Sequence, residues 1–254
     1  MVAQPSENRR SVLNIKCPDN ILIGNPTCID TDSVSIQHKG HLMIASCSFD
    51  PDKFDQNHLK ILNISLPSSL HNAVAKRKSE FLAGRYLAKI MLDNLGYNDV
   101  NVAINHDRSP LWPAGLLGSI SHSNNKVLCV TTKSHHCNYL GIDIEHWLPE
   151  TDAGSLVHNI VVNETEYQKM LPYLSFNRAI TLIFSAKESL YKAIFKEFGH
   201  YVDFHAAMVT GLDFNAQQLT LTLCQDLSDT MYAGRQFICQ FSIAEQSVTT
   251  LISD

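Results

Sequence analysis

The chain has 254 residues, of which 44% are hydrophobic and 18% charged. This composition is typical of a globular protein with one large domain or two of ordinary size. No apolar stretch approaches the ~20 residues that span a bilayer, so we expect no membrane span. The formal net charge of −5 argues against binding nucleic acid through overall charge.

The start of the chain and the cysteines exclude further classes. Residues 1–20 contain no basic segment followed by an apolar run, so we expect no signal peptide and a cytoplasmic protein. Seven scattered cysteines form no CxxC pair, which argues against a zinc site and against a disulfide framework. We therefore expect reduced, buried thiols.

Strand and helix patterns follow one another in the first half of the chain. Residues 41–49 predict a strand. Apolar residues recur at threes and fours over 73–95, which predicts a helix that ends at Gly96. Residues 100–106 alternate like a strand, and the proline and glycine residues of 108–118 indicate a loop.

A polar break separates the next two predicted strands. Residues 126–133 and 139–147 predict the strands, and the run 134–138 between them predicts a linker. The paired histidines of this linker have no second ligand cluster at a matching spacing, so we expect no metal there. A strong helical pattern covers 177–198 and ends at Gly199. Three alternating runs then predict an antiparallel sheet: 219–225, 235–243 and 247–253.

This order of elements predicts an α+β (α/β) protein whose two α/β halves meet near residue 135. The N-terminal half covers 1–135 and the C-terminal half covers 136–254. Residues 1–70 are interpreted as irregular segments with short strands.

Positive charge concentrates on the first predicted helix. A local basic patch on an acidic protein indicates one specific anionic ligand. Segment 75–89 carries five basic residues, Lys76, Arg77, Lys78, Arg85 and Lys89, against the single acid Glu80.

Two carboxylates share one face of the predicted strand GIDIE, 141–145. Side chains alternate faces along a strand, so Asp143 and Glu145 lie on the same side, with Cα atoms roughly 6.5–7 Å apart. Carboxylates this close repel each other unless a cation lies between them, and oxygen-only ligands suit magnesium. A solvent-facing acidic edge is the alternative.

The second predicted helix offers a further acid and a base. Ser185, Glu188 and Lys192 fall at i, i+3 and i+7 on one side of the helix. Glu188 and Lys192 could form a surface ion pair, or they could supply a third carboxylate for the metal and a cation for a phosphate.

The stretch GSISHS (118–123) places a serine beside a histidine. In an extended segment Ser121 and His122 face opposite ways, which is a poor arrangement for proton transfer between them. The segment also lacks the GxSxG turn of a hydrolase nucleophile. Hydroxyls, backbone N–H groups and a histidine suit a phosphate cradle, and a strand end with a surface histidine is the alternative.

Taken together, these stretches resemble the 4'-phosphopantetheinyl transferases of the surfactin type, and within them the branch represented by enterobactin synthase component D. Four blocks occur in the family's order: 76–85, 108–123, 141–145 and 184–193. GIDIE alone is a weak pattern, but its pairing with a (W/F)SxKExxxK block is highly specific.

The resemblance implies a reaction and its partners. This family transfers 4'-phosphopantetheine from coenzyme A to a serine of an apo acyl or peptidyl carrier protein, releases adenosine 3',5'-bisphosphate and requires magnesium. Its fold has two similar α/β halves related by a pseudo-twofold, with coenzyme A in the cleft between them. The branch implies a monomer that serves a siderophore synthase or another secondary-metabolite synthase of the nonribosomal peptide, polyketide or fatty acid type.

The resemblance also implies roles for the acidic residues and one lysine. Asp143, Glu145 and Glu188 would bind magnesium together with the pyrophosphate of coenzyme A. Glu188, or a water that it orients, is the candidate base for the carrier serine, and Lys192 would pair with a pyrophosphate oxygen. The catalytic residues implied are thus Glu188, Lys192 and Asp143.

Further residues would bind the phosphates of coenzyme A. The resemblance implies this role for Ser121 and His122, with His122 near the 3'-phosphate. The remaining positive charge would come from Lys76, Arg77 and Arg85.

This chain departs from the surfactin-type pattern beside Pro110. Surfactin-type members have a lysine immediately before this proline, where the present chain has Ser109. Arg108 would make the corresponding contact, as in enterobactin-type members, and Phe184 replaces tryptophan within the pattern of that branch.

Two other classes of function stay open on the sequence. A magnesium-dependent phosphohydrolase acting on a nucleotide-type pyrophosphate could use the same acids without a carrier. A non-catalytic module that binds carrier proteins or nucleotides would tolerate a broken acidic triad, yet Asp143, Glu145 and Glu188 are all present.

Overall fold

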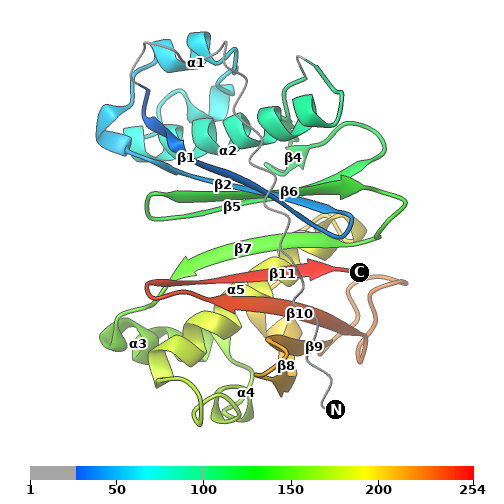
Figure 1. Ribbon diagram of the computed structural model, residues 1–254. Helices are drawn as coiled ribbons and strands as arrows, with labels where there is room; N and C mark the ends of the chain where they lie inside the picture. Colours follow the sequence, from blue (N-terminus) through cyan, green and yellow to red (C-terminus); the bar gives the residue numbers. More distant parts are fainter. Residues whose placement is uncertain (1–26, 99) are drawn as a thin grey trace, which may run out of the picture.

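A computed structural model describes residues 27–98 and 100–254 of the protein. Two antiparallel sheets lie edge to edge, and each carries one long helix against a face (Figure 1). Helices together with antiparallel sheets confirm the α+β prediction. The pseudo-twofold relation between two halves and the division of the chain at residue 135 stay predictions.

The first sheet has the strand order β1-β2-β6-β5 and packs against the long helix α2. Helix α1 and the two-stranded sheet β3-β4 lie in the same half of the molecule (Figure 1). These elements are β1 (Ile29–Lys39), β2 (Leu42–Phe49), α1 (Asn57–Ile61), α2 (Ala75–Asn94), β3 (Ala103–Ile104), β4 (Pro110–Leu111), β5 (Leu116–Ser123) and β6 (Lys126–Lys133).

The second sheet has the strand order β7-β11-β10-β9-β8 and packs against the long helix α5. Helix α3 packs on α5, and the short helix α4 lies between α3 and α5 in the chain. These elements are β7 (Leu140–His146), α3 (Glu150–Ile160), α4 (Thr165–Gln168), α5 (Phe176–Ile194), β8 (Ala207–Asp213), β9 (Gln218–Leu223), β10 (Gln236–Ile243) and β11 (Ser247–Ser253).

Most elements lie where the sequence predicts them. The two long helices and the strands predicted at 41–49, 126–133 and 139–147 are present, as is the antiparallel tail. The strand prediction over 100–106 is wrong in extent, because only two residues pair with β4. Sequence patterns missed β8 and the helices α1, α3 and α4, and they indicated only short strands where β1 lies, because partly polar strands and short helices leave weak periodicity. The loop predicted over 108–118 contains β4 and the first residues of β5, so that prediction is wrong in extent.

Gly141 explains why the strand GIDIE starts with glycine. A Cβ at this position would lie 2.0 Å from the backbone oxygen of Ser189 and 2.7 Å from the backbone nitrogen of Ala193. Helix α5 therefore crosses β7 in direct backbone contact, and any side chain would push the two elements apart. This close approach brings the polar face of α5 to Asp143 and Glu145.

Apolar side chains fill the space under each helix and also join the two sheets. One cluster lies between α2 and the first sheet, and a second lies between α5 and the second sheet. A third cluster takes its members from both sheets, which ties the two edges together. Its buried members are Leu42, Val130, Cys137, Leu140, Ile142 and Leu251.

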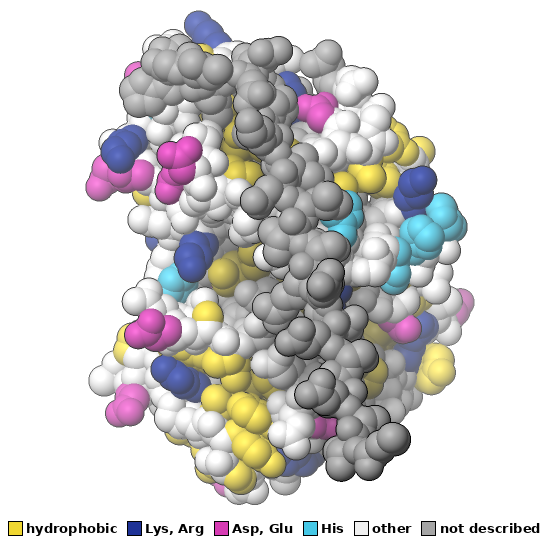
Figure 2. Space-filling view, in the orientation of Figure 1, with side chains coloured by type: hydrophobic (Ala, Val, Ile, Leu, Met, Phe, Trp, Pro, Cys, Tyr) yellow, Lys and Arg dark blue, Asp and Glu magenta, His cyan; other side chains and the backbone are white. Residues whose placement is uncertain are grey.

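The basic segment on α2 does not form one surface patch, so this prediction is wrong in extent. Arg85 and Lys89 are only 8% exposed, because α2 packs on the sheet with most of its circumference covered. Lys76 and Arg77 remain exposed at the first turn of α2. On the face drawn in Figure 2, basic and acidic side chains are interspersed.

The structure tests the predictions on membrane spans and on cysteines only over the residues that it describes. Along residues 27–98 and 100–254, no helix has the length and apolar character needed to cross a bilayer. Cys17 and the N-terminal segment considered for a signal peptide lie outside the described residues. Of the other cysteines, Cys224 is exposed and five are buried: Cys28, Cys47, Cys129, Cys137 and Cys239.

Candidate active site

Asp143 lies at the centre of a hydrogen-bonded group where the two sheets meet. Its carboxylate is almost fully buried and accepts from Ser121 Oγ at 2.7 Å and Ser185 Oγ at 2.8 Å. The ammonium of Lys192 lies 2.5 Å from Asp143 Oδ1 and 3.0 Å from Ser121 Oγ. A strand of each sheet and helix α5 therefore converge on one carboxylate.

Glu145 and Glu188 lie within the electrostatic influence of Asp143. Burial and then the charge of Asp143 raise the pKa of Glu145 to about 7, although a hydrogen bond from Ser123 Oγ, 3.2 Å away, opposes the rise. Burial raises the pKa of Glu188 as well, and the nearby Lys192 opposes that rise. These carboxylates hold protons more tightly than isolated ones, which is typical of functional sites.

The three acids have the donor chemistry of a magnesium site but are not gathered into one. Carboxylate oxygens are the ligands that magnesium prefers, and the mutual repulsion of these acids is the condition that a divalent cation relieves. As placed in the described part of the chain, no group of three acidic, histidine or cysteine side chains converges closely enough to hold a metal ion. In this arrangement Lys192 neutralises Asp143.

His122 faces the opposite way from Ser121, as strand alternation predicts. Its Nε2 accepts from the guanidinium of Arg77 at 2.9 Å, which requires a neutral imidazole, and lies 3.6 Å from Glu80. Arg77 also pairs with Glu80 at 3.2 Å. Burial first, and then the cations Arg77 and Lys192, lower the pKa of His122. This histidine is therefore set up to accept a hydrogen bond.

The other basic residues that sequence analysis selected do not contact this group. Arg85 is buried on α2 with its guanidinium 4.9 Å from the Phe81 ring centroid, and burial lowers its pKa to about 10. Its Nε has no hydrogen-bond partner within the described residues. Lys76 is exposed, and Arg108 lies on the loop before β4 with a φ of 70°.

Two pockets flank α5 on either side of Tyr191. The larger pocket, of about 250 Å³, is lined by three cations, Arg108, Lys192 and Lys196, by one acid, Asp107, and by apolar side chains such as Trp112. Tyr191 lines this pocket and also a smaller one of about 60 Å³.

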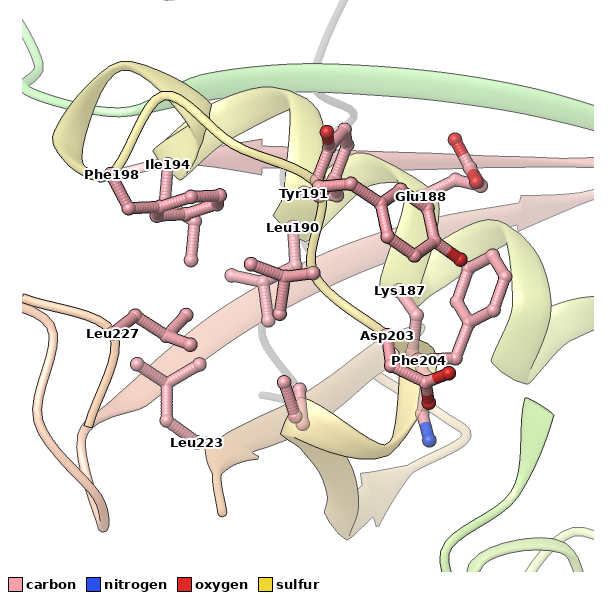
Figure 3. Close-up of a pocket in the computed structure, with 14 residues that line it drawn as sticks. Lys187, Glu188, Leu190, Tyr191, Ile194, Phe198, Asp203, Phe204, Leu223 and Leu227 are labelled. Atoms are coloured by element: carbon pink, nitrogen blue, oxygen red, sulfur yellow. The ribbon is translucent and has the colours of Figure 1, made fainter. Parts of the chain in front are cut away.

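The smaller pocket is mainly apolar (Figure 3). Glu188 and Tyr191 lie along its upper side, and Asp203 and Phe204 lie below them. Leu190 and Ile194 of α5 and Leu223 of β9 add to the wall, and most of the other lining residues come from the segment 198–207 that follows α5. The Glu188 carboxylate is thus bordered by apolar surface, consistent with the rise of its pKa.

The structure brings together some of the predicted site residues and separates others. Asp143, Ser121 and Lys192 are in direct contact, and Glu145 and Glu188 share their electrostatic environment. His122 and Arg77 contact each other on the other face of β5.

Sequence reasoning missed one buried ion pair and one hydroxyl. Lys187 precedes Glu188 on α5, and its ammonium pairs with the fully buried Glu166 at 3.0 Å. No sequence pattern links these two positions. The hydroxyl of Ser123 could have been found, because it shares a strand face with Ser121.

Comparisons with known proteins define the class. The family model of the 4'-phosphopantetheinyl transferase N-terminal domain matches residues 66–132. The model of the 4'-phosphopantetheinyl transferase superfamily matches residues 139–247, which include Asp143, Glu188 and Lys192. The chain belongs to the 4'-phosphopantetheinyl transferase superfamily.

Similar proteins place the chain in one branch of that superfamily. It is 35% identical to enterobactin synthase component D of Salmonella typhimurium over 216 residues, 85% of this chain and 86% of the relative. It is 38% identical to enterobactin synthase component D of Escherichia coli over 166 residues, 64% and 75% of the two chains. The transferase PptT of Mycobacterium tuberculosis is 29% identical over 141 residues, 54% of this chain and 60% of PptT. The branch is that of the enterobactin synthase component D proteins.

Proposed function

We propose that the protein transfers 4'-phosphopantetheine from coenzyme A to a serine of an apo acyl or peptidyl carrier protein and releases adenosine 3',5'-bisphosphate. One observation carries the proposal. In a chain of this superfamily, Lys192 and Asp143 are in contact beside a cationic pocket, while Glu188 borders an apolar one. Family membership favours transfer to a carrier over a phosphohydrolase or a non-catalytic module.

Coenzyme A would lie in the cleft between the halves 1–135 and 136–254. Arg108, Lys192 and Lys196 give the larger pocket positive charge, which suits the phosphates of a nucleotide. Further phosphate contacts would come from the first half of the chain: Lys76, Arg77, Arg85, Ser121 and His122. A neutral His122 can still donate from Nδ1, or become charged when an anionic phosphate lies beside it.

The acids Asp143, Glu145 and Glu188 would hold magnesium together with the pyrophosphate. The carboxylate oxygens of all three acids suit a divalent cation, and the raised pKa values of Glu145 and Glu188 mark carboxylates whose ionised forms a cation would favour. Magnesium supplies, when bound, the positive charge that stabilises the leaving bisphosphate. Lys192 would then exchange part of its contact with Asp143 for a pyrophosphate oxygen.

Glu188 would act as the base, directly or through a water. The Oγ of the carrier serine forms a bond to the phosphorus that bears pantetheine, and the bond from this phosphorus to the bridging oxygen breaks. That oxygen leaves with adenosine 3',5'-bisphosphate, and the serine proton passes to Glu188. Its apolar surroundings make Glu188 a stronger base than an exposed carboxylate. Alignment and charge neutralisation dominate such displacements at phosphorus.

The client of the transferase would be a secondary-metabolite synthase. Relatives at 34–38% identity bear the name enterobactin synthase component D, which supports a siderophore synthase of the nonribosomal peptide type. We further propose that the protein works in the cytoplasm as a monomer.

The direct test is the intact mass of a carrier protein. Purified protein is incubated with coenzyme A, magnesium and an apo carrier, and the carrier should gain the mass of one phosphopantetheine group. A carrier whose acceptor serine is replaced by alanine should gain nothing. No mass gain on carriers of nonribosomal peptide, polyketide and fatty acid types would refute the proposal.

A further inference from the structure

Serine side chains pair the edges of the two sheets where they meet. β5 is the edge strand of the first sheet, β7 is the edge strand of the second, and the two lie side by side (Figure 1). Three serine hydroxyls on β5, here called the serine seam, each accept a hydrogen bond from a backbone N–H of β7. The pairs are Ser119 with Ile142 at 3.1 Å, Ser121 with Ile144 at 3.4 Å, and Ser123 with His146 at 3.2 Å.

The register of these pairs shows how the seam works. Each step of two residues on β5 matches a step of two on β7 in the same direction, so the strands run parallel. Edge strands present unpaired N–H groups, which are costly when buried. Hydroxyls satisfy the β7 groups and join the two sheets without a continuous backbone ladder.

Each hydroxyl that accepts from β7 can still donate one hydrogen bond. Ser121 donates to Asp143 Oδ1 at 2.7 Å, and Ser123 lies in the same relation to Glu145, 3.2 Å from Oε2. The Nδ1 of His146, 3.3 Å from Ser123 Oγ, can act as a further donor to it. Each of these serines therefore contacts two successive residues of β7. It binds the carboxylate of the first residue and the backbone N–H of the second.

Ser119 has no such second role. Ser119 accepts from the N–H of Ile142, and the residue before Ile142 is Gly141, which carries no side chain. Gly141 thus takes the position that Asp143 and Glu145 have in the other two pairs. Ser119 therefore binds the backbone of β7 but no carboxylate, whereas Ser121 and Ser123 bind both. The chain thus contains its own control for the carboxylate contact. Ser119 also lines the larger pocket, so its variant is compared at saturating coenzyme A.

We infer that the serine seam fixes the register of the two sheets and that Ser123 is a positioning residue for Glu145. The hydroxyl of Ser123 restrains the carboxylate on the strand face it shares with Asp143, so the first half of the chain helps to set the donor geometry in the second. The part that concerns Glu145 rests on the proposed function, and the part that concerns the backbone register does not.

The test compares three full-length variants: Ser123→Ala, Ser123→Thr and Ser119→Ala. Residue-resolved amide hydrogen exchange without ligands reports on the seam. The amides of Gly141, Asp143 and Glu145 face β11 by strand alternation and serve as internal references. The magnesium concentration that gives half-maximal carrier modification reports on the positioning of Glu145.

We expect faster exchange of the His146 amide in Ser123→Ala and of the Ile142 amide in Ser119→Ala, relative to the reference amides. At saturating coenzyme A, only Ser123→Ala should raise the magnesium requirement, by about 10-fold, the lower end of effects around metal ligands. Ser123→Thr retains a hydroxyl and should restore the wild-type value.

Two results would overturn the inference. Equal magnesium requirements in Ser123→Ala and Ser119→Ala, or a Ser123→Thr variant that behaves like Ser123→Ala, would remove the positioning role. Unchanged exchange at His146 and Ile142 would remove the seam. If the wild-type protein modifies no carrier, the proposed function fails and with it the role toward Glu145, while the exchange measurement still decides the seam.

Discussion

The two long helices α2 and α5 each pack on a sheet but use their charged residues differently. On α2, Arg77 pairs with Glu80 one turn away. The buried Arg85 lies over the Phe81 ring and forms no ion pair with an acid of the described residues. On α5, Lys187 and Lys192 both reach acids on other elements, Glu166 and Asp143.

This difference indicates that α2 serves to bind an anionic ligand and that α5 serves the transfer reaction itself. Helix α2 contributes positive charge without a balancing acid at Arg85, which suits an anionic ligand. Helix α5 brings acids and a base together at the meeting of the two sheets, which suits a cation and a proton transfer. Substitutions on the two helices and at the acids that they contact should therefore have separable effects.

Asp143→Ala should have the largest effect on activity. It removes the carboxylate that Ser121, Ser185 and Lys192 hold, so the rate of carrier modification should fall by more than about 100-fold. Asp52→Ala changes an exposed acid in the turn that follows β2 and should leave the rate unchanged. Equal rates for the two variants would show that Asp143 has no part in the chemistry.

Glu166→Ala should have the largest effect on stability. The Glu166 carboxylate accepts from the Val162 and Val209 amides and from buried Lys187. Its loss leaves a buried cation unpaired, so the free energy of unfolding should fall by about 3–5 kcal/mol, as denaturant titration would measure.

The matched control for this variant is Glu164→Ala, at an exposed position two residues earlier. Its free energy of unfolding should stay within about 0.5 kcal/mol of the wild-type value. Similar losses in both variants would show that the Lys187–Glu166 pair contributes nothing particular to the support of α5.

Arg77→Ala tests the binding role of α2. The substitution removes a charge-assisted contact worth about 1.5–3 kcal/mol, so the KM for coenzyme A should rise by about tenfold or more with little change in kcat. Lys53→Ala breaks another exposed i,i+3 ion pair, with Asp50, and should leave KM unchanged. A fall in kcat without a rise in KM would place Arg77 in the chemistry instead.

Glu145→Gln should change how stability depends on pH, which is the smallest effect. The pKa of Glu145 is raised to about 7, so the folded protein binds more protons than the unfolded chain between its ordinary value of 4.5 and 7. The tighter binding of this proton in the folded state stabilises the fold. The stabilisation is complete below pH 4.5 and is lost as the pH rises through 7.

Thermal unfolding in the presence of a chelator measures this effect. The wild-type protein should lose more stability between pH 5 and pH 8 than Glu145→Gln does. The lowered pKa of His122 acts in the opposite direction in both proteins and cancels in the comparison. Identical pH dependence would contradict the buried environment of Glu145.

Local patterns predicted the two long helices, most of the central strands and the facing of side chains along β5. Alternation along β5 places Ser121 and His122 on opposite sides, which the structure confirms. Terminating glycines predicted the ends of both long helices to within a few residues, since Gly96 and Gly199 adopt the positive φ that other residues avoid.

Tertiary contacts decide what the sequence could not predict. Charge counting along α2 cannot show that Arg85 and Lys89 are buried, because burial depends on the sheet and loops around the helix. Nor can spacing within α5 show that Lys187 reaches Glu166 while Lys192 reaches Asp143, because both acids belong to other elements. Strand alternation predicted which face of the strand a side chain lies on, but not which residue it contacts.

The most direct test of the account is the yield of adenosine 3',5'-bisphosphate per carrier modified, in reactions with and without carrier and with and without magnesium. We expect one bisphosphate for each modified carrier, and none when either the carrier or magnesium is left out. Release of bisphosphate from coenzyme A without a carrier, or full transfer in the presence of a chelator, would contradict it.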